Sequence, residues 1–279
     1  MRTKTAMVTG ANSGMGLATA IELAKQGAHV IMVCRNQHRG EEALYQVSKK
    51  SGSKSISLML CDLGSFSSIQ RFAKSFEGQF NQLDVLINNA GVVTIKRQTT
   101  INGYEMMLGV NYLGHFLLTI LLLDSIKKSS DGRIINISSG AHKIGKIDIR
   151  YPNLSKSYNP ATAYGRSKLL NILFTKELQR REPELAVFAL HPGAVATNLG
   201  VDRNSGFGEK VYSYLHPFFL SPSQGSETAV FLATNETIPS KKGNYFYRKQ
   251  VAPTAKTAKD EVLAKQVWEW GMNQVKLYI

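Results

Sequence analysis

At positions 9–16 the chain reads Thr9-Gly10-Ala11-Asn12-Ser13-Gly14-Met15-Gly16, after the apolar run Ala6–Thr9 and before the periodic segment Leu17–Gln26. Glycine is needed where a backbone turns tightly or approaches a phosphate without a Cβ atom, and the start of a helix presents free N–H groups to an anion. Turns between a strand and a helix also use glycine for steric reasons alone, and the Gly-x3-Gly-x-Gly spacing differs from the usual Gly-x-Gly-x-x-Gly. The place of the stretch after the first strand favours a site for a dinucleotide pyrophosphate, formed by Gly10, Asn12, Ser13, Gly14, Met15 and Gly16.

Apolar runs that have the character of buried strands alternate with segments of helical periodicity as far as Leu190. Continuous Val, Ile and Leu runs bounded by turn residues are typical of a parallel sheet that is covered on both faces. The alternation predicts an α/β fold with a doubly wound parallel sheet of the Rossmann type, which binds its ligand at the carboxyl ends of the strands. The predicted strands are Ala6–Thr9, Val30–Val33, Ile56–Leu60, Val85–Ile87, Ile134–Ile137 and Val187–Leu190. The predicted helices are Leu17–Gln26, Gly40–Ser51, Ser67–Phe80, Tyr104–Lys128 and Ala163–Arg181.

No linker rich in Pro, Gly or Ser divides the 279 residues, and single α/β domains of this length are common. We expect one domain over residues 1–279, with a cofactor half at about 1–130 and a catalytic and substrate half at about 131–279. The segment Gly206–Pro222 is rich in Phe, Tyr and Leu. It is either a lid over an apolar ligand or a core helix with an irregular approach. Loose contact of Phe207–Leu220 with a membrane is a further alternative.

The composition narrows the classes of function. Lys and Arg number 34 against 20 Asp and Glu, which gives a net charge of +14, yet the basic residues are dispersed and accompany no nucleic-acid motif. This favours a solvated surface over a nucleic-acid partner. Two cysteines and scattered histidines predict neither a disulfide framework nor a metal site. The longest apolar run, Phe116–Leu123, is far shorter than the ~20 residues that span a bilayer, and the N-terminus lacks a signal-peptide core, so we expect a cytoplasmic protein without an integral membrane segment.

The ends of the second and third predicted strands bear on the choice of dinucleotide. Where NAD enzymes usually carry an acid for the ribose 2′-hydroxyl, this chain has Arg35 and Asn36. An arginine can pair with a 2′-phosphate, so Arg35 favours NADP, while a merely solvated arginine is the alternative. Asp62, followed by Leu63, is placed to contact the adenine amino group, although aspartate is also a common helix N-cap.

Tyr164 and Lys168 are the residues expected to move a proton. Positions i and i+4 share one face of a helix, so the Lys168 ammonium can lie near the Tyr164 phenol, favour the phenolate and bring the pKa of the phenol toward the working range. The same spacing occurs at Tyr45/Lys49 and at Tyr245/Lys249. Only Tyr164 opens the helix after the fifth strand, where it can meet a ligand at the carboxyl edge of the sheet.

The fifth strand ends in Ser138-Ser139-Gly140. A hydroxyl there can hydrogen-bond the carbonyl or alcohol oxygen of a substrate and share its developing charge. Serines at strand ends are more often simple turn residues, so the position alone does not establish a catalytic role.

Together these residues resemble the short-chain dehydrogenase/reductase family over about Thr5 to Leu199. The pattern also includes Asn88-Asn89-Ala90-Gly91, Asn111 and His191-Pro192-Gly193-Ala194-Val195-Ala196-Thr197. The resemblance implies that Tyr164 is the acid/base, that Lys168 also holds the nicotinamide ribose, and that Ser139, the second serine of its pair, orients the substrate. It implies further that Asn111 supports a proton-relaying water. The cofactor contacts that it implies include Asn89, Ala90, Gly91, Pro192, Gly193, Val195 and Thr197.

The long segment between Ser139 and Tyr164, with Cys34-Arg35-Asn36, resembles the retinol-dehydrogenase-like branch of NADP-dependent carbonyl reductases. Animal members of that branch commonly carry an N-terminal membrane anchor, whereas here the glycine-rich stretch begins at residue 9. The resemblance implies hydride transfer between NADPH and an apolar aldehyde or ketone, or the reverse from the alcohol. The predicted helices Tyr104–Lys128 and Ala163–Arg181 carry apolar residues beyond what one sheet face needs, including Leu113, Phe116, Leu117, Ile120, Leu169, Ile172, Leu173 and Phe174. In the family such helices pair across a two-fold axis, which implies a homodimer; the alternative is that they merely cover the sheet of a monomer. A non-catalytic NADP(H)-binding redox sensor is the alternative function.

Overall fold

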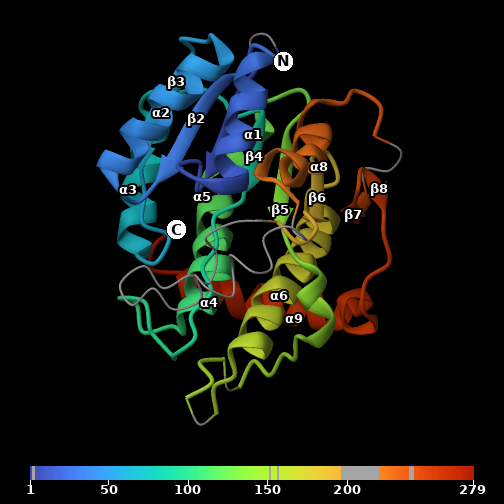
Figure 1. Cartoon of the computed structure of the whole chain (residues 1–279). Helices are drawn as coiled ribbons and strands as arrows, with labels where there is room; N and C mark the ends of the chain where they lie inside the picture. Colours follow the sequence, from blue (N-terminus) through green and yellow to red (C-terminus); the bar gives the residue numbers. More distant parts are fainter. Residues whose placement is uncertain (2–3, 151, 156, 196–219, 239–241) are drawn as a thin grey trace.

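The structure is a computed structural model that describes residue 1 and residues 4–150, 152–155, 157–195, 220–238 and 242–279. Its centre is an eight-stranded sheet in the order β3-β2-β1-β4-β5-β6-β7-β8 (Figure 1). The first seven strands run parallel, and β8 pairs antiparallel with β7. The strands are β1 (Thr5–Thr9), β2 (His29–Cys34), β3 (Ile56–Leu60), β4 (Val85–Asn88), β5 (Arg133–Ile137), β6 (Ala186–His191), β7 (Lys242–Tyr247) and β8 (Gln250–Val251). The predicted doubly wound α/β fold is confirmed.

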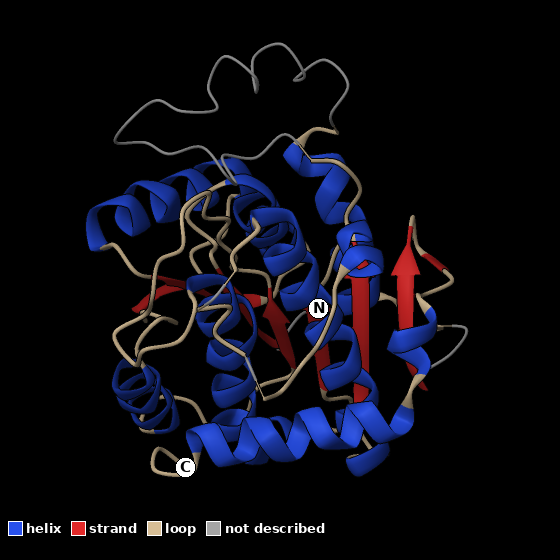
Figure 2. Cartoon of the chain, turned by 90° about the horizontal axis from the view of Figure 1, so that it is seen from below, coloured by secondary structure: helices blue, strands red, loops and turns tan. Residues whose placement is uncertain are grey.

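Helices cover both faces of the sheet (Figure 2). One face is packed by α1 (Gly14–Lys25), α2 (Gln37–Ser51) and α8 (Pro222–Thr234). The other is packed by α3 (Phe66–Glu77), α5 (His115–Lys127) and α6 (Pro160–Arg181). Alternation of side chains along a strand supplies both hydrophobic clusters: in β1, Met7 packs toward α3 and α5, whereas Ala6 and Val8 pack toward α1 and α8.

The strand order creates a crevice between β1 and β4. On one side β1 pairs with β2, and on the other Ala6–Val8 pairs with Val85–Ile87. The chain leaves β1 through α1 toward β2 and reaches β4 only later, so the loops after β1 and β4 diverge. Sheets of this kind bind their ligands at that divergence, beyond the carboxyl ends of the strands.

The predicted helix Tyr104–Lys128 is not one regular α-helix. A short α4 (Met106–Leu108) leads into a π-helical turn, Gly109–Gly114, which continues into α5. Single π-helical turns are found frequently at functional sites, and this one contains Asn111. Among the described residues, Met106–Lys127 alone has the length and apolar composition of a membrane-spanning helix, but 78% of its most apolar window is buried inside the fold, as in a core helix.

The helix α9 (Glu261–Val275) closes over α5 and α6. Trp268 meets Phe116 edge-on, with ring centroids 5.3 Å apart, and stacks on Phe174 at 5.9 Å. The apolar residues that suggested a dimer interface are largely buried within this one chain: Leu113, Phe116, Leu117, Leu169, Ile172, Leu173 and Phe174. They therefore give no argument for a homodimer, which stays a prediction.

Candidate active site

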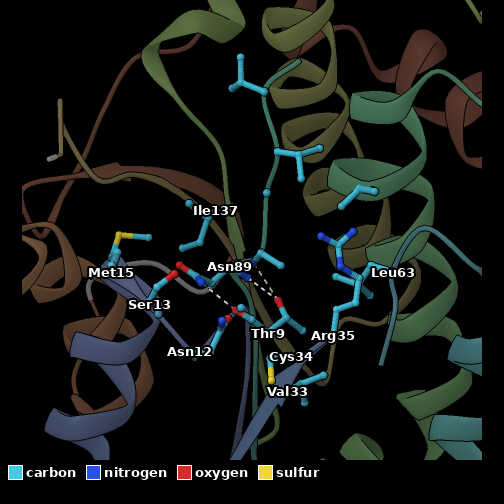
Figure 3. A pocket seen from close by; sticks show the side chains of 18 of the residues that line it. Thr9, Asn12, Ser13, Met15, Val33, Cys34, Arg35, Leu63, Asn89 and Ile137 are labelled. Atoms are coloured by element: carbon cyan, nitrogen blue, oxygen red, sulfur yellow. Dashed lines mark hydrogen bonds between the residues drawn. The ribbon is translucent and has the colours of Figure 1, made fainter. Parts of the chain in front are cut away.

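A cleft of about 770 Å³ opens at the carboxyl ends of β1, β2, β4 and β5. Figure 3 shows Ser13 and Met15 on one side of it and Arg35 and Leu63 on the other, with Thr9 and Asn89 between them. Most of the predicted site residues line this cleft: Gly10, Asn12, Ser13, Gly14, Met15, Gly16, Arg35, Asn36, Asp62, Leu63, Asn89, Ala90, Gly91, Ser139, Tyr164, Lys168, Pro192, Gly193 and Val195. Thr197 lies outside the described residues.

The glycine-rich stretch between β1 and α1 has the form of an anion cradle. Gly10 and Gly14 adopt positive φ angles of 66° and 54°, a conformation that glycine tolerates best. A Cβ atom on Gly16 would lie 2.4 Å from the Gly10 carbonyl oxygen, so only glycine fits there. Ser13, the N-cap of α1, makes no side-chain capping hydrogen bond, whereas side chains cap α2, α3, α6, α8 and α9. The uncapped N-terminus of α1 suits the pyrophosphate of a dinucleotide.

Asn89, directly after β4, is hydrogen-bonded to Thr9 at the start of the glycine-rich stretch. Its side-chain amide donates to the Thr9 carbonyl oxygen at 2.7 Å, and the backbone N–H groups of Asn89 and Ala90 each donate to Thr9 Oγ1 at 2.9 Å. These hydrogen bonds are drawn in Figure 3. The loops after β1 and β4 are therefore held together at the base of the cleft.

Two arginines face the cleft from the β2–α2 connection. Arg35 is exposed, and Arg39, which the sequence argument overlooked, lines the cleft from the first turn of α2. Asn36 accepts a hydrogen bond from the Arg39 backbone N–H at 3.0 Å and so caps α2. The cleft has no acidic side chain on this connection. The donors present suit a phosphate on the ribose.

Asp62 does not cap α3. Its Oδ1 accepts from the Gly64 N–H at 2.9 Å, while Ser65 is the residue that caps the helix. The helix-cap alternative for Asp62 is therefore wrong. Cys34 and Cys61 are buried free thiols at the ends of β2 and β3, and burial raises the pKa of Cys61 to about 12, so this thiol is unreactive at neutral pH.

The face of α6 that lines the cleft carries Tyr164 and Lys168. The Lys168 Nζ lies 5.6 Å from the centre of the Tyr164 ring and donates to the Ile137 carbonyl oxygen at 3.0 Å. Burial lowers the pKa of Lys168 to about 8. The expected fall in the pKa of Tyr164 is not found, because burial raises it; a hydrogen bond with Ser139 acts in the opposite direction. The contact with Ser139 thus acts in favour of the phenolate.

The two serines after β5, Ser138 and Ser139, differ in their contacts and in their exposure. Ser138 is buried and donates to the Lys168 carbonyl oxygen at 2.7 Å, so its hydroxyl is used within the fold. Ser139 accepts from the Ala141 N–H at 3.2 Å and is partly exposed in the cleft. The preference for the second serine agrees with this arrangement.

Asn111 does not line the cleft. It is fully buried, and its amide exchanges hydrogen bonds with the backbone of Val92 at 2.8 and 3.0 Å and donates to Ser167 Oγ at 3.1 Å. The structure thus brings Ser139, Tyr164 and Lys168 together at one wall and places Asn111 behind them.

A buried ion pair anchors α6 beside the site. The Arg166 Nη2 lies 3.0 Å from the Glu105 Oε2, and both side chains are almost fully shielded from solvent. Glu105 also accepts from the N–H groups of Met107 and Leu108, and Arg166 donates to the Pro152 carbonyl oxygen. The pair joins the first turns of α6 to the start of the segment that contains Asn111.

Comparison with known proteins identifies the family. A model of the short chain dehydrogenase family matches residues 4–206. The chain belongs to the short-chain dehydrogenase/reductase family, and it is accordingly an oxidoreductase of the class that acts on alcohol and carbonyl groups.

Its relatives define the branch. The chain is 40% identical over 268 residues to human retinol dehydrogenase 11, an alignment that covers 95% of this chain and 84% of that protein. It is 42% identical over 275 residues to human retinol dehydrogenase 13, with coverage of 95% and 82%. The chain is a member of the retinol-dehydrogenase-like branch of the family.

Solved structures show the same architecture. An uncharacterised protein from Mycobacterium paratuberculosis has a TM-score of 0.79 and 32% identity and covers 99% of this chain and 94% of its own. A short chain dehydrogenase from Shigella flexneri, complexed with NADP, has a TM-score of 0.67 and 21% identity and covers 85% and 93%. At 21% identity, the similarity to the Shigella flexneri structure shows a shared fold alone.

Proposed function

We propose that the chain is an NADP(H)-dependent oxidoreductase that interconverts an apolar aldehyde or ketone with the corresponding alcohol, with Tyr164 as the general acid/base. One observation carries the proposal: a single cleft connects the uncapped start of α1 and the Arg35–Arg39 pair with Ser139, Tyr164 and Lys168. In this proposal residues 1–130 supply most of the cofactor contacts, and the half from about 131 to 279 supplies the catalytic residues and further contacts to the nicotinamide end.

The residues present fit NADP(H). The glycine-rich stretch and the start of α1 would hold the pyrophosphate, Arg35 and Arg39 the 2′-phosphate, and Asp62 the adenine. Lys168 would hold the nicotinamide ribose, and Pro192, Gly193 and Val195 would border the ring. The bound nicotinamide supplies the hydride.

The chain's own residues handle the proton and the substrate oxygen. For reduction, the Ser139 hydroxyl donates to the carbonyl oxygen of the substrate, and the Tyr164 hydroxyl transfers its proton to that oxygen as the carbon is reduced. The Lys168 ammonium then stabilises the phenolate that Tyr164 becomes. Oxidation of the alcohol reverses each transfer.

An apolar substrate is supported by the walls of the cleft and by the relatives. Val92, Val93, Ile137 and Val195 contribute apolar surface to the cleft that Tyr164 and Ser139 also line. The relatives named above act, by their names, on retinol, which is an apolar alcohol.

The test is oxidation of NADPH, with NADH in parallel, by the wild type and by Tyr164→Phe against apolar aldehydes, ketones and quinones. Turnover with NADPH that the Tyr164→Phe substitution abolishes would support the reductase. Tight NADPH binding without turnover across the panel would favour a redox sensor instead. A homodimer and a cytoplasmic location stay predictions, open to light scattering and to cell fractionation.

A further inference from the structure

His115, the first residue of α5, is buried beneath the cleft and has no part in the mechanism above. Its Nε2 lies 2.9 Å from Thr9 Oγ1, at the end of β1, and its Nδ1 lies 3.2 Å from the carbonyl oxygen of Asn111 in the π-helical turn. The ring therefore spans the space between the cofactor stretch and the element behind the catalytic wall.

The donors and acceptors around His115 fix its tautomer. A carbonyl oxygen only accepts, so Nδ1 carries the hydrogen and donates to Asn111. Burial lowers the pKa of His115 to about 3, so the ring is neutral at physiological pH and Nε2 must accept. Thr9 then donates its one hydroxyl hydrogen to Nε2 at 2.9 Å, a shorter contact than the 3.4 Å to the Ile87 carbonyl oxygen, while its oxygen accepts the N–H groups of Asn89 and Ala90.

The hydrogen bonds continue beyond Asn111 to the catalytic helix. The Asn111 amide donates to Ser167 Oγ at 3.1 Å, and Ser167 donates to the Tyr164 carbonyl oxygen at 2.8 Å. The donors point the same way along this path, which enters Asn111 at its backbone carbonyl and leaves from its side-chain amide. It therefore consists of two hydrogen-bonded segments joined by Asn111, and within each segment the buried bonds hold their members in one arrangement.

We propose that His115 is a positioning residue that couples the cofactor-binding stretch at Thr9 to the backbone of Tyr164 through Asn111. The inference rests on the proposed function, because that function is what makes Tyr164 the general acid/base. In physical terms, hydrogen bonds through His115 and Asn111, in addition to packing, fix the position of Tyr164 relative to the glycine-rich stretch.

The first test needs neither cofactor nor substrate. Nitrogen-15 NMR of the histidine-labelled full chain, with His115→Asn to assign the signal, should show a neutral His115 ring with hydrogen on Nδ1 and none on Nε2 down to pH 5. Hydrogen on Nε2 instead would remove the donor to Asn111 and overturn the proposal.

The second test compares His115→Phe, which keeps a flat ring without its nitrogens, with Leu118→Ala, which removes a buried apolar side chain from the same helix. We expect His115→Phe to lower kcat by roughly 10- to 100-fold, because small misplacements of reacting groups cost this much, and to raise the solvent deuterium isotope effect on kcat. Leu118→Ala should lower the denaturation midpoint and leave kcat and the isotope effect near those of the wild type.

Two further variants separate positioning from misfolding. His115→Asn, whose amide can reach the place of Nδ1, should recover part of kcat, and Thr9→Val combined with His115→Phe should lose little more than the worse single variant, because both break one chain. A His115→Phe protein that keeps kcat, or losses that simply multiply in the double variant, would overturn the proposal while Tyr164-dependent turnover stands. A wild type without turnover would overturn the proposed function, and with it this inference.

Discussion

The Nδ1 of His142 lies 2.7 Å from the carbonyl oxygen of Ser139. Since that oxygen only accepts, Nδ1 carries the hydrogen, and Nε2 accepts from the Ala255 N–H at 3.2 Å. A neutral imidazole thus joins the end of β5 to the chain that follows β8. Through His142, the backbone of Ser139 is linked to Ala255, which lies outside the loop that follows β5.

We expect His142→Phe to lower kcat by about tenfold and to leave the Kd for NADPH unchanged, because the substitution loosens Ser139 without touching the cofactor stretch. Steady-state kinetics and NADPH fluorescence titration measure the two quantities. His38→Phe is the control, since His38 is 82% exposed on α2. Equal losses in the two variants would contradict a role for His142 at Ser139.

The histidines also predict how stability depends on pH. Burial lowers the pKa values of His29, His115, His142 and His191 below 6.5, so below that pH the unfolded chain binds protons that the folded chain does not. Stability is therefore fully present above pH 6.5 and is lost as the pH falls through it. From pH 7.5 to 5.5 His115 alone should remove about 1.4 kcal/mol from the free energy of unfolding. Urea denaturation at both pH values measures this, and an unchanged midpoint would refute it.

Arg35 and Arg39 predict the cofactor preference. Arg35→Ala should raise the Kd for NADPH roughly 10- to 100-fold and change that for NADH little, because charge-assisted hydrogen bonds contribute about 1.5–3 kcal/mol. Arg39→Ala should act in the same direction. Lys50→Ala removes the same charge from the exposed far end of α2. If it weakened NADPH binding as much as Arg35→Ala does, only the net charge would matter.

The Glu105–Arg166 pair predicts a loss of stability that a second substitution repairs. Glu105→Gln should lower the free energy of unfolding by about 3–5 kcal/mol, because it leaves the Arg166 guanidinium buried without a countercharge. Glu105→Gln with Arg166→Met should recover most of that loss in urea denaturation. The exposed pair of Lys25 and Glu22 is the control, and Glu22→Gln should cost less than about 1 kcal/mol. A double variant no better than Glu105→Gln would contradict the electrostatic account.

The six strands up to Leu190 were predictable, because each is a mainly apolar run bounded by turn residues, and all except the edge strand β3 are largely buried between two layers of helices. No observed bound of these strands differs from the predicted one by more than one residue. The strand β7 was missed because Lys242–Tyr247 begins with Lys-Gly-Asn and is not an apolar run, and its place depends on pairing with β6 across a register shift. Helices α8 and α9 were missed with it.

The residues that line the cleft were predictable where their type and spacing are typical of the expected chemistry, as for Tyr164, Lys168 and the glycines. Residues that act through geometry were not. Nothing in the spacing of the sequence distinguishes a π-helical turn from an α-helix, so the burial of Asn111 and its bond to His115 could not be foreseen. Arg39 carried a weak signal, since it lies one helical turn beyond Arg35.

The pairing of β1 with β4 also governs how the chain folds. The Thr5 N–H donates to the Asp84 carboxylate across 79 residues of sequence, so these neighbours meet only after a long loop has closed, which makes such sheets slow to form. The cofactor cleft lies at the carboxyl ends of β1 and β4, so it exists only in chains in which these two strands have paired. A ligand of the cleft therefore stabilises the native state alone, by mass action. The supply of reduced or oxidised dinucleotide would then set how much of the protein escapes proteolysis, and its abundance in the cell would follow its cofactor.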